Sequence, residues 1–189
     1  MLKNLVNQNN VQGFQNYITN NTLGVDAINY VFESGKPEII KTYVNTVFPI
    51  GEEFVKYQDD VVRYGTRKTL ATYYLYNDLK PSGEIELIKR DEKTPFLFYT
   101  NSNGLSDEAF EYLLKEGSED LVDGYLDNTS LKDEKLETFL SVGNTKYITR
   151  YLDYANGTEY EELLNKLKKM PNKKKAQRIY KECIDVLFN

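Results

Sequence analysis

The 189-residue sequence contains no histidine, no tryptophan and only one cysteine. Without histidine the chain cannot form a Ser-His-Asp or Cys-His catalytic site, and it has no imidazole general base. A zinc site needs at least three protein ligands, and in this chain none of them could be a histidine and only one could be a cysteine. The single cysteine, Cys183, also excludes an internal disulfide. We therefore predict a protein that binds rather than catalyses, with no enzymatic activity, no cofactor and no metal site.

The sequence also lacks a long apolar run and an apolar leader at its N-terminus. No stretch approaches about 18 apolar residues, the length that suggests a membrane-spanning helix, and the mean hydropathy is −0.59. These features and the single cysteine predict a soluble, cytoplasmic protein without membrane association. Asn, Lys, Tyr and Ile, whose codons are AT-rich, are abundant. Because that bias is typical of many phages and low-GC bacteria, we predict a viral (phage) or low-GC bacterial factor.

Acidic residues outnumber basic residues in the chain as a whole but not in its C-terminal segment. The whole sequence has 24 Lys and Arg against 29 Asp and Glu, a net charge of −5. Residues 166–189 hold eight basic and two acidic residues, a net of +6, which leaves −11 on the remaining 165 residues. An acidic body therefore ends in a basic segment, and this asymmetry bears on both partners and self-association.

Tyrosine is plentiful, with 16 residues, and six of them mark an internal repeat. Their spacings are 26, 30, 26, 26 and 26 residues. An apolar residue stands three positions before each, and a Gly, Asn or Asp stands eight positions before each; the latter residue types suit the left-handed conformation that ends a helix. The tyrosines are Tyr17, Tyr43, Tyr73, Tyr99, Tyr125 and Tyr151, and the Gly/Asn/Asp column is Asn9, Gly35, Gly65, Asp91, Gly117 and Gly143. A tyrosine that recurs in every unit is best interpreted as a packing residue.

Each unit is predicted to contain two helices separated by the Gly/Asn/Asp turn. Adjacent apolar residues recur three and four positions before that turn, and sets such as Leu136, Phe139 and Leu140 follow the i, i+3, i+4 period of a helix. Two departures are expected: a four-residue insertion that lengthens the first helix of the third unit near residues 51–64, and Pro95, which delays the start of a second helix. One helix pair cannot bury its apolar stripe alone, so the pairs must stack.

These patterns predict an all-α protein, an α-solenoid of stacked helix-turn-helix repeats with a longer C-terminal pair of capping helices. We expect about six units over residues 1–157 and the basic cap over residues 158–189. The cap begins with the capping box Thr158-Glu159-Tyr160-Glu161, is interrupted at Pro171, and ends in a helix whose apolar side includes Cys183.

The predicted second helices resemble those of ankyrin repeats. In residues 35–44, 117–126 and 143–152 a glycine is followed four and five residues later by an apolar pair, and the segment ends in Tyr-Val or Tyr-Leu. The resemblance covers roughly residues 2–153. The Thr-Pro-Leu-His opening of ankyrin is missing, and the period is about seven residues shorter than 33, which leaves no room for the β-hairpin. The resemblance implies an ankyrin-like protein-binding scaffold whose first helices line the concave side.

The predicted partner is another protein, bound through an acidic concave face. Acidic faces bind basic surfaces, which include the nucleic-acid-binding surfaces of enzymes. The candidate contact residues lie on three predicted first helices: Asn29, Tyr30, Glu33, Glu111, Tyr112, Lys115, Glu137 and Ser141.

The basic C-terminal segment supports an alternative function, direct binding of nucleic acid. A third interpretation is a solvated cap that touches the acidic body of a neighbouring copy, which would make the protein a homo-oligomer. The candidate nucleic-acid-binding residues are Lys168, Lys169, Lys173, Lys174, Lys175 and Arg178. Cys183 lies on the apolar side of the last helix and is predicted to be a core residue.

Overall fold

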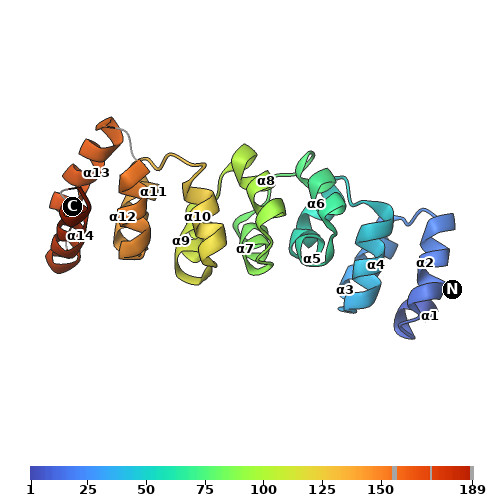
Figure 1. Ribbon diagram of the computed structural model, residues 1–189. Coiled ribbons are helices and arrows are strands. Elements are labelled where there is room, and N and C mark those ends of the chain that lie inside the picture. Colours follow the sequence, from blue (N-terminus) through green and yellow to red (C-terminus); the bar gives the residue numbers. More distant parts are fainter. Residues whose placement is uncertain (155–156, 171, 188–189) are drawn as a thin grey trace. The chain divides into compact units, whose positions relative to one another are not determined.

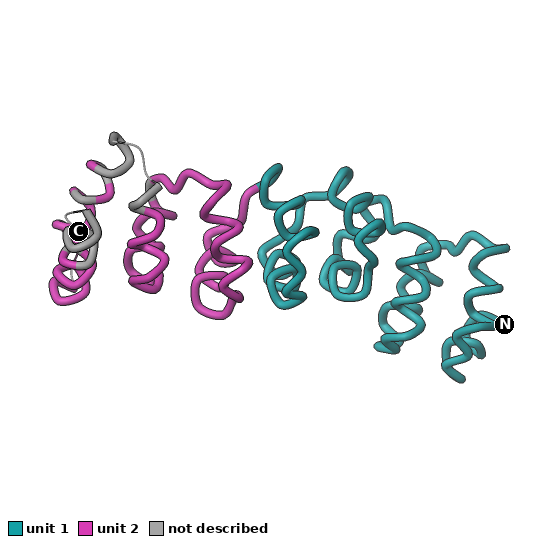
Figure 2. Tube along the Cα trace, in the orientation of Figure 1, with its two compact units in different colours: residues 1–103 teal, residues 104–189 magenta. Residues whose placement is uncertain are grey.

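A computed structural model describes residues 1–154, 157–170 and 172–187, and the regular secondary structure of these residues consists of helices with no strand (Figure 1). The all-α class is thereby confirmed. The chain divides into two compact units, residues 1–103 and residues 104–189 (Figure 2). The first unit contains α1 (Leu2–Asn7), α2 (Val11–Asn20), α3 (Val25–Glu33), α4 (Pro37–Val47), the 3-10 helix η1 (Glu52–Tyr57), α5 (Gln58–Tyr64), α6 (Arg67–Tyr74), α7 (Pro81–Lys89) and α8 (Lys93–Asn103). The second contains α9 (Asp107–Glu116), α10 (Glu119–Leu126), α11 (Asp133–Val142), α12 (Thr145–Tyr154), α13 (Gly157–Lys169) and α14 (Lys173–Leu187).

Within each unit, helices of the same kind pack against one another. In the first unit α1 contacts α3, α5 contacts α7, α2 contacts α4 and α6 contacts α8. In the second unit α11 contacts both α9 and α13, and α12 contacts both α10 and α14. First helices thus pack on first helices and second helices on second helices, except beside the insertion, where the second helix α4 packs on the first helix α5. The predicted start of the cap, residue 158, falls one residue inside α13.

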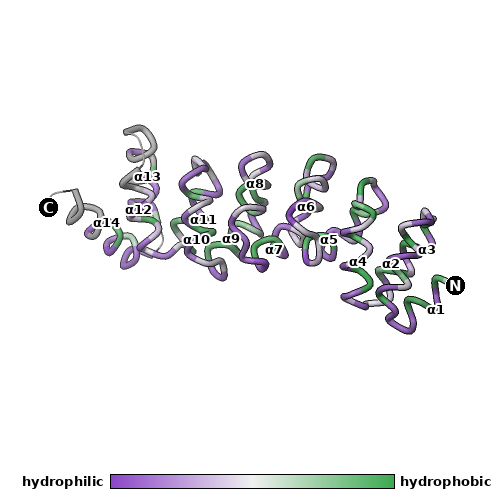
Figure 3. The backbone as a smooth tube through the Cα atoms, turned by 45° about the vertical axis from the view of Figure 1, so that its right-hand side comes forward, coloured by the Kyte–Doolittle hydropathy of each residue, from purple (hydrophilic) through white to green (hydrophobic). Residues whose placement is uncertain are grey.

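The buried side chains are those of the repeat columns. Apolar and polar stretches alternate along the helices (Figure 3), and the apolar residue before each column tyrosine is buried in every described case, as with Phe14 and Ile148 at 0% exposure. Four of the column tyrosines are among the largest fully buried side chains: Tyr43, Tyr73, Tyr99 and Tyr125. Since these rings fill space between helices, the predicted packing role is confirmed for these four tyrosines, whereas Tyr17 is only half-buried.

Two phenol groups of this column also satisfy backbone N–H groups in the turns between helix pairs. The hydroxyl of Tyr99 accepts a hydrogen bond from the Leu79 N–H at 3.1 Å and donates to Glu84 Oε1 at 3.2 Å. The hydroxyl of Tyr151 accepts one from the Leu131 N–H at 2.8 Å. Both leucines are buried and lie 20 residues before their tyrosine. A buried N–H without a partner is costly, so a tyrosine fits these positions better than a phenylalanine.

Burial of the tyrosine column should make the fold sensitive to alkali. Burial, with a smaller contribution from the Glu53 carboxylate, raises the pKa of Tyr43 from 10.0 to about 12. Burial, with a smaller contribution from Asp59, raises the pKa of Tyr73 equally, and burial also moves the pKa of Tyr74 and Tyr99 upward. Above pH 10 the unfolded chain loses tyrosine protons that the folded chain keeps, so the free energy of unfolding falls as the pH rises.

We therefore expect cooperative unfolding between pH 10 and about 12. Tyrosinate absorbance and helical circular dichroism, recorded in one titration, should change together. Smooth ionisation of all tyrosines with the helical signal retained would contradict the burial of these phenols.

The Gly/Asn/Asp column ends the first helices in two different ways. Asn9, Gly35 and Asp91 are left-handed, with φ of 52°, 63° and 54°. At the other three positions the backbone is not left-handed, so the predicted conformation is wrong there; these residues are Gly65, Gly117 and Gly143. Each is followed by Thr, Ser or Asn at the position before the next helix, as in the N-cap Thr66, whose hydroxyl accepts from the Thr69 N–H. Glycine is needed at these positions because the chain passes close to a carbonyl: a Cβ on Gly117 would lie 2.6 Å from the Leu113 oxygen.

These two geometries give a testable difference between substitutions at equivalent repeat positions. Gly35→Asn should cost less than about 1 kcal/mol, because asparagine tolerates the left-handed conformation and nothing lies within 4 Å of the added Cβ. Gly117→Asn should cost about 2–3 kcal/mol, because the new Cβ collides with a helix carbonyl. Urea denaturation of the two variants measures the difference, and equal costs would contradict the second geometry.

The four-residue insertion does not lengthen an α-helix, contrary to the sequence prediction. The chain turns at Phe48 and Gly51, with φ of 53° and 130°, and residues 52–57 form η1 ahead of a short α5. Phe54 is 4% exposed, and the Tyr57 ring stacks on Phe32 with centroids 4.2 Å apart. The insertion thus adds aromatic side chains to the core of the first unit.

The predicted effect of Pro95 is also wrong. α8 begins at Lys93, so Pro95 is its third residue. Proline is tolerated in a first helical turn because the N–H that it lacks would have no partner within the helix.

Candidate partner-binding groove

Two of the predicted contact residues in the first unit are used within the fold. The Tyr57 hydroxyl donates to Asn29 Oδ1 at 3.0 Å, and the Tyr30 hydroxyl donates to Asn7 Oδ1 at 2.5 Å. Each bond joins residues of neighbouring helix pairs. Glu33, the third candidate in this unit, is exposed.

The five candidates of the second unit lie on α9 and α11. Glu111 and Lys115 form an i,i+4 ion pair on α9, and Tyr112 between them is half-buried. Glu137 and Ser141 on α11 are exposed. These last two residues line a groove of about 760 Å³ that also involves α13 and the start of α14. The volume falls within the range of about 300–1,000 Å³ that ligand sites occupy.

The groove has an acidic side and a basic side. Carboxylates come from α9 and α11, with Asp107, Glu134 and Glu137, and ammonium groups come from Lys166, Lys169 and Lys175. Met170 adds apolar surface, and Leu140 also lines the groove but is only 1% exposed. The groove therefore brings together residues of both predicted sets: Glu137 and Ser141 from the protein-binding set, Lys169 and Lys175 from the nucleic-acid set.

Two of the three lysines are engaged by the protein itself. Lys166 pairs with Glu137 at 3.2 Å. The Lys175 ammonium donates to the carbonyls of Ser141 and Gly143 at 2.6 and 3.0 Å, and burial lowers the pKa of this lysine. Since the C-terminal end of a helix carries partial negative charge, Lys175 closes the end of α11. Its role in the fold makes Lys175 unsuited to binding phosphate.

Three charges in the groove have no partner among the described residues: the carboxylates of Asp107 and Glu134 and the ammonium of Lys169. Asp107 lies in the first turn of α9, where negative charge also favours the helix. The groove thus offers an incoming ligand more negative than positive charge. Asp107, Glu134 and Met170 were not among the site residues predicted from the sequence. The only indication in the sequence for the two carboxylates was their position in the first turns of predicted helices.

The other residues of the predicted nucleic-acid set do not share the groove. Lys168 and Lys173 line a second pocket, and Lys174 and Arg178 are exposed on α14. The basic segment is therefore divided between several places. Cys183 lies within α14, and its side chain is outside the described part of the chain.

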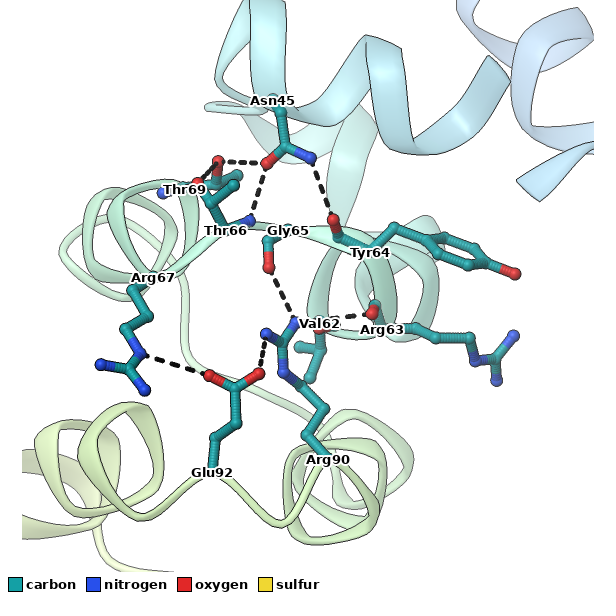
Figure 4. Close-up of polar contacts among 10 residues, drawn as sticks. All are labelled: Asn45, Val62, Arg63, Tyr64, Gly65, Thr66, Arg67, Thr69, Arg90 and Glu92. Atoms are coloured by element: carbon teal, nitrogen blue, oxygen red, sulfur yellow. Dashed lines mark hydrogen bonds and ion pairs between the residues drawn. The ribbon is translucent and has the colours of Figure 1, made fainter. Parts of the chain in front are cut away.

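Two polar clusters that the sequence did not suggest join neighbouring helix pairs in the first unit (Figure 4). Asn45 of α4 donates to the Tyr64 carbonyl at 3.0 Å and accepts from the Thr66 N–H and the Thr69 hydroxyl, both at 2.7 Å. One amide group thus satisfies the turn between α5 and α6. This cluster stabilises the packing of helix pairs and offers no free group to a ligand.

Arg90 forms the second cluster. Its guanidinium donates to the carbonyls of Val62 and Gly65 at 2.5 and 2.8 Å, which closes the end of α5, and it pairs with Glu92 at 2.5 Å. Arg67 also pairs with Glu92, at 3.3 Å. Arg90 in the first unit and Lys175 in the second therefore close the preceding first helix in the same manner.

Comparisons with family models, with curated proteins and with solved structures found no match for this chain. None of the helices in the described residues is long and apolar enough to cross a membrane. Within residues 1–154, 157–170 and 172–187, no three side chains of His, Cys, Asp or Glu are grouped so that they could hold a metal ion.

Proposed function

We propose that the protein is a non-catalytic scaffold that binds a basic segment of another protein in the groove of the second unit. In this proposal the helix pairs form an ankyrin-like α-solenoid. The 26-residue repeat and the packing of first helices on first helices support that architecture. The proposal includes a cytoplasmic location and a phage or low-GC bacterial origin, which rest on composition alone.

The observation that carries the proposal is the imbalance of free charge in the groove. Two carboxylates, Asp107 and Glu134, have no partner among the described side chains, against one ammonium group, that of Lys169. The other two lysines, Lys166 and Lys175, are engaged by Glu137 and by the end of α11. A ligand with lysine or arginine side chains would gain two charge-assisted contacts without displacing an internal one. A ligand with only acidic side chains would face the free carboxylates.

The apolar surface of the groove indicates a second element of the ligand. Met170 is half-buried, and methionine adapts to varied apolar partners. Contacts to Met170 would supply apolar burial, on which protein interfaces depend, while the carboxylates would select basic segments. The favoured ligand is thus a basic segment that also carries apolar side chains.

Fluorescence anisotropy tests this proposal with defined probes. The protein is titrated against a fluorescein-labelled peptide rich in arginine and leucine and against two controls, one with glutamine for arginine and one with serine for leucine. The proposal expects the arginine-leucine peptide to bind most tightly, and binding should weaken at high salt. Equal binding of all three peptides, or no binding of the first, would refute it.

A further inference from the structure

A second pocket lies between α13 and α14. Its volume is about 400 Å³, and it is lined by Leu167, Lys168, Met170, Lys173, Ala176 and Gln177. The pocket thus has an apolar lining flanked by two lysines, one from each helix. Both lysines are exposed, and neither has a partner among the described residues.

The lysines at the start of α14 are unfavourable for the helix itself. Lys173, Lys174 and Lys175 occupy the first turn of α14, which contains no acidic residue. Positive charge in a first turn opposes the helix dipole, and three adjacent ammonium groups repel each other. Lys175 is compensated by the carbonyls at the end of α11. Lys173 and Lys174 have no such compensation among the described residues, so their charge is unexplained by the fold.

We propose that this pocket is a docking site for an acidic segment of a partner protein that inserts an apolar side chain. The half-buried apolar residues Met170 and Ala176 would receive that side chain, and Lys168 and Lys173 would pair with carboxylates beside it. Anion binding would offset the repulsion in the first turn of α14. This pocket is distinct from the groove in which the proposed function places the basic ligand, because the two share only Met170 among their lining residues.

Three observations favour an acidic peptide over nucleic acid. The lysines flank an apolar pocket rather than forming a continuous strip. The sequence between residues 161 and 181 contains one aromatic residue, Tyr180, whereas single strands are commonly held by stacking on several aromatic rings. The free carboxylates Asp107 and Glu134 belong to a groove that shares Met170 with the pocket, and they would repel an extended polyanion. A short segment with a few carboxylates avoids that repulsion.

The test uses the full chain and four labelled probes: a peptide rich in glutamate and leucine, the same peptide with serine for leucine, a single-stranded oligonucleotide, and vesicles that contain phosphatidylserine. The glutamate-leucine peptide should bind at least about 10-fold more tightly than its serine version. The double variant Lys168→Glu/Lys173→Glu should weaken its binding by about 10-fold or more. The matched variant Lys41→Glu/Lys93→Glu, at two exposed lysines of the first unit, should change it less than about twofold.

Each other outcome overturns the proposal. Equal binding of the two peptides would mean simple attraction of negative charge without an apolar pocket. Tighter binding of the oligonucleotide or the vesicles, lost in Lys168→Glu/Lys173→Glu, would assign the surface to nucleic acid or to anionic lipid. Self-association at low salt that this variant abolishes, measured by sedimentation velocity, would show that a second copy of the chain occupies the site. Circular dichroism of both variants should match the parent, since all four lysines are exposed.

Discussion

Replacement of Phe32 by alanine is expected to lower the free energy of unfolding by about 3–5 kcal/mol. Phe32 is 4% exposed and stands at the centre of a cluster of four rings. It packs edge-on against Tyr43 and Phe54 at 5.9 and 6.3 Å and is stacked on Tyr57 at 4.2 Å. The substitution leaves a cavity between helix pairs and removes all three ring contacts.

The same substitution at Phe98 provides the control. Phe98 is 48% exposed, so Phe98→Ala should cost less than about 1 kcal/mol. Urea denaturation followed by circular dichroism measures both variants against the parent. If Phe32→Ala cost no more than Phe98→Ala, the aromatic cluster could not be the core that η1 completes.

The second large effect is expected on binding. The double substitution Asp107→Lys/Glu134→Lys should raise the Kd for the arginine-leucine peptide by about 30-fold or more, because two attractions become two repulsions. Stability should change little, since both side chains are exposed and have no partner among the described residues. Reversal of Asp107 also removes a favourable charge from the first turn of α9, at a cost of about 0.3–1 kcal/mol.

A control for this double variant changes the net charge equally but leaves the groove intact. Asp78 and Asp120 are exposed and line neither pocket, and Asp120 occupies a first helical turn as Asp107 does. Asp78→Lys/Asp120→Lys should therefore leave the Kd within about threefold of the parent value. Equal loss in both variants would mean that the peptide responds to overall charge, and the groove would then have no special role.

The repeat columns were sufficient to predict the helix pairs, because burial depends on residue type and period. A tyrosine such as Tyr43, with an apolar residue three positions before it, can face the core only if the segment is helical. The turn conformation was less predictable, because glycine suits both a left-handed turn and a close approach to a carbonyl. The residue after the glycine distinguishes the two: the hydroxyl of Thr66 caps the next helix, whereas Lys36 at the equivalent position does not cap one with its side chain.

The groove could not be predicted because it depends on contacts between distant residues. Lys166, Met170 and Lys175 lie outside the 26-residue repeat and reach α11 only when α13 and α14 have packed. The conformation of the four-residue insertion also depends on contacts between distant residues. Its length alone predicted a longer helix, whereas the burial of Phe54 and the stacking of Tyr57 on Phe32 determine the conformation that it adopts. Local sequence predicted the helices, and the sites depend on how the helices pack.

The most direct test of groove binding uses the two methionines of the chain as reporters. Met170 lines the groove, and Met1 lies in the first unit with 86% exposure. In the protein labelled with ¹³C at the methionine methyl groups, the arginine-leucine peptide should shift the NMR signal of Met170 and leave that of Met1 unchanged. The Met170 shift should disappear in Asp107→Lys/Glu134→Lys and persist in Asp78→Lys/Asp120→Lys. Binding of the peptide without a shift at Met170, or with equal shifts at both methionines, would contradict the proposed function.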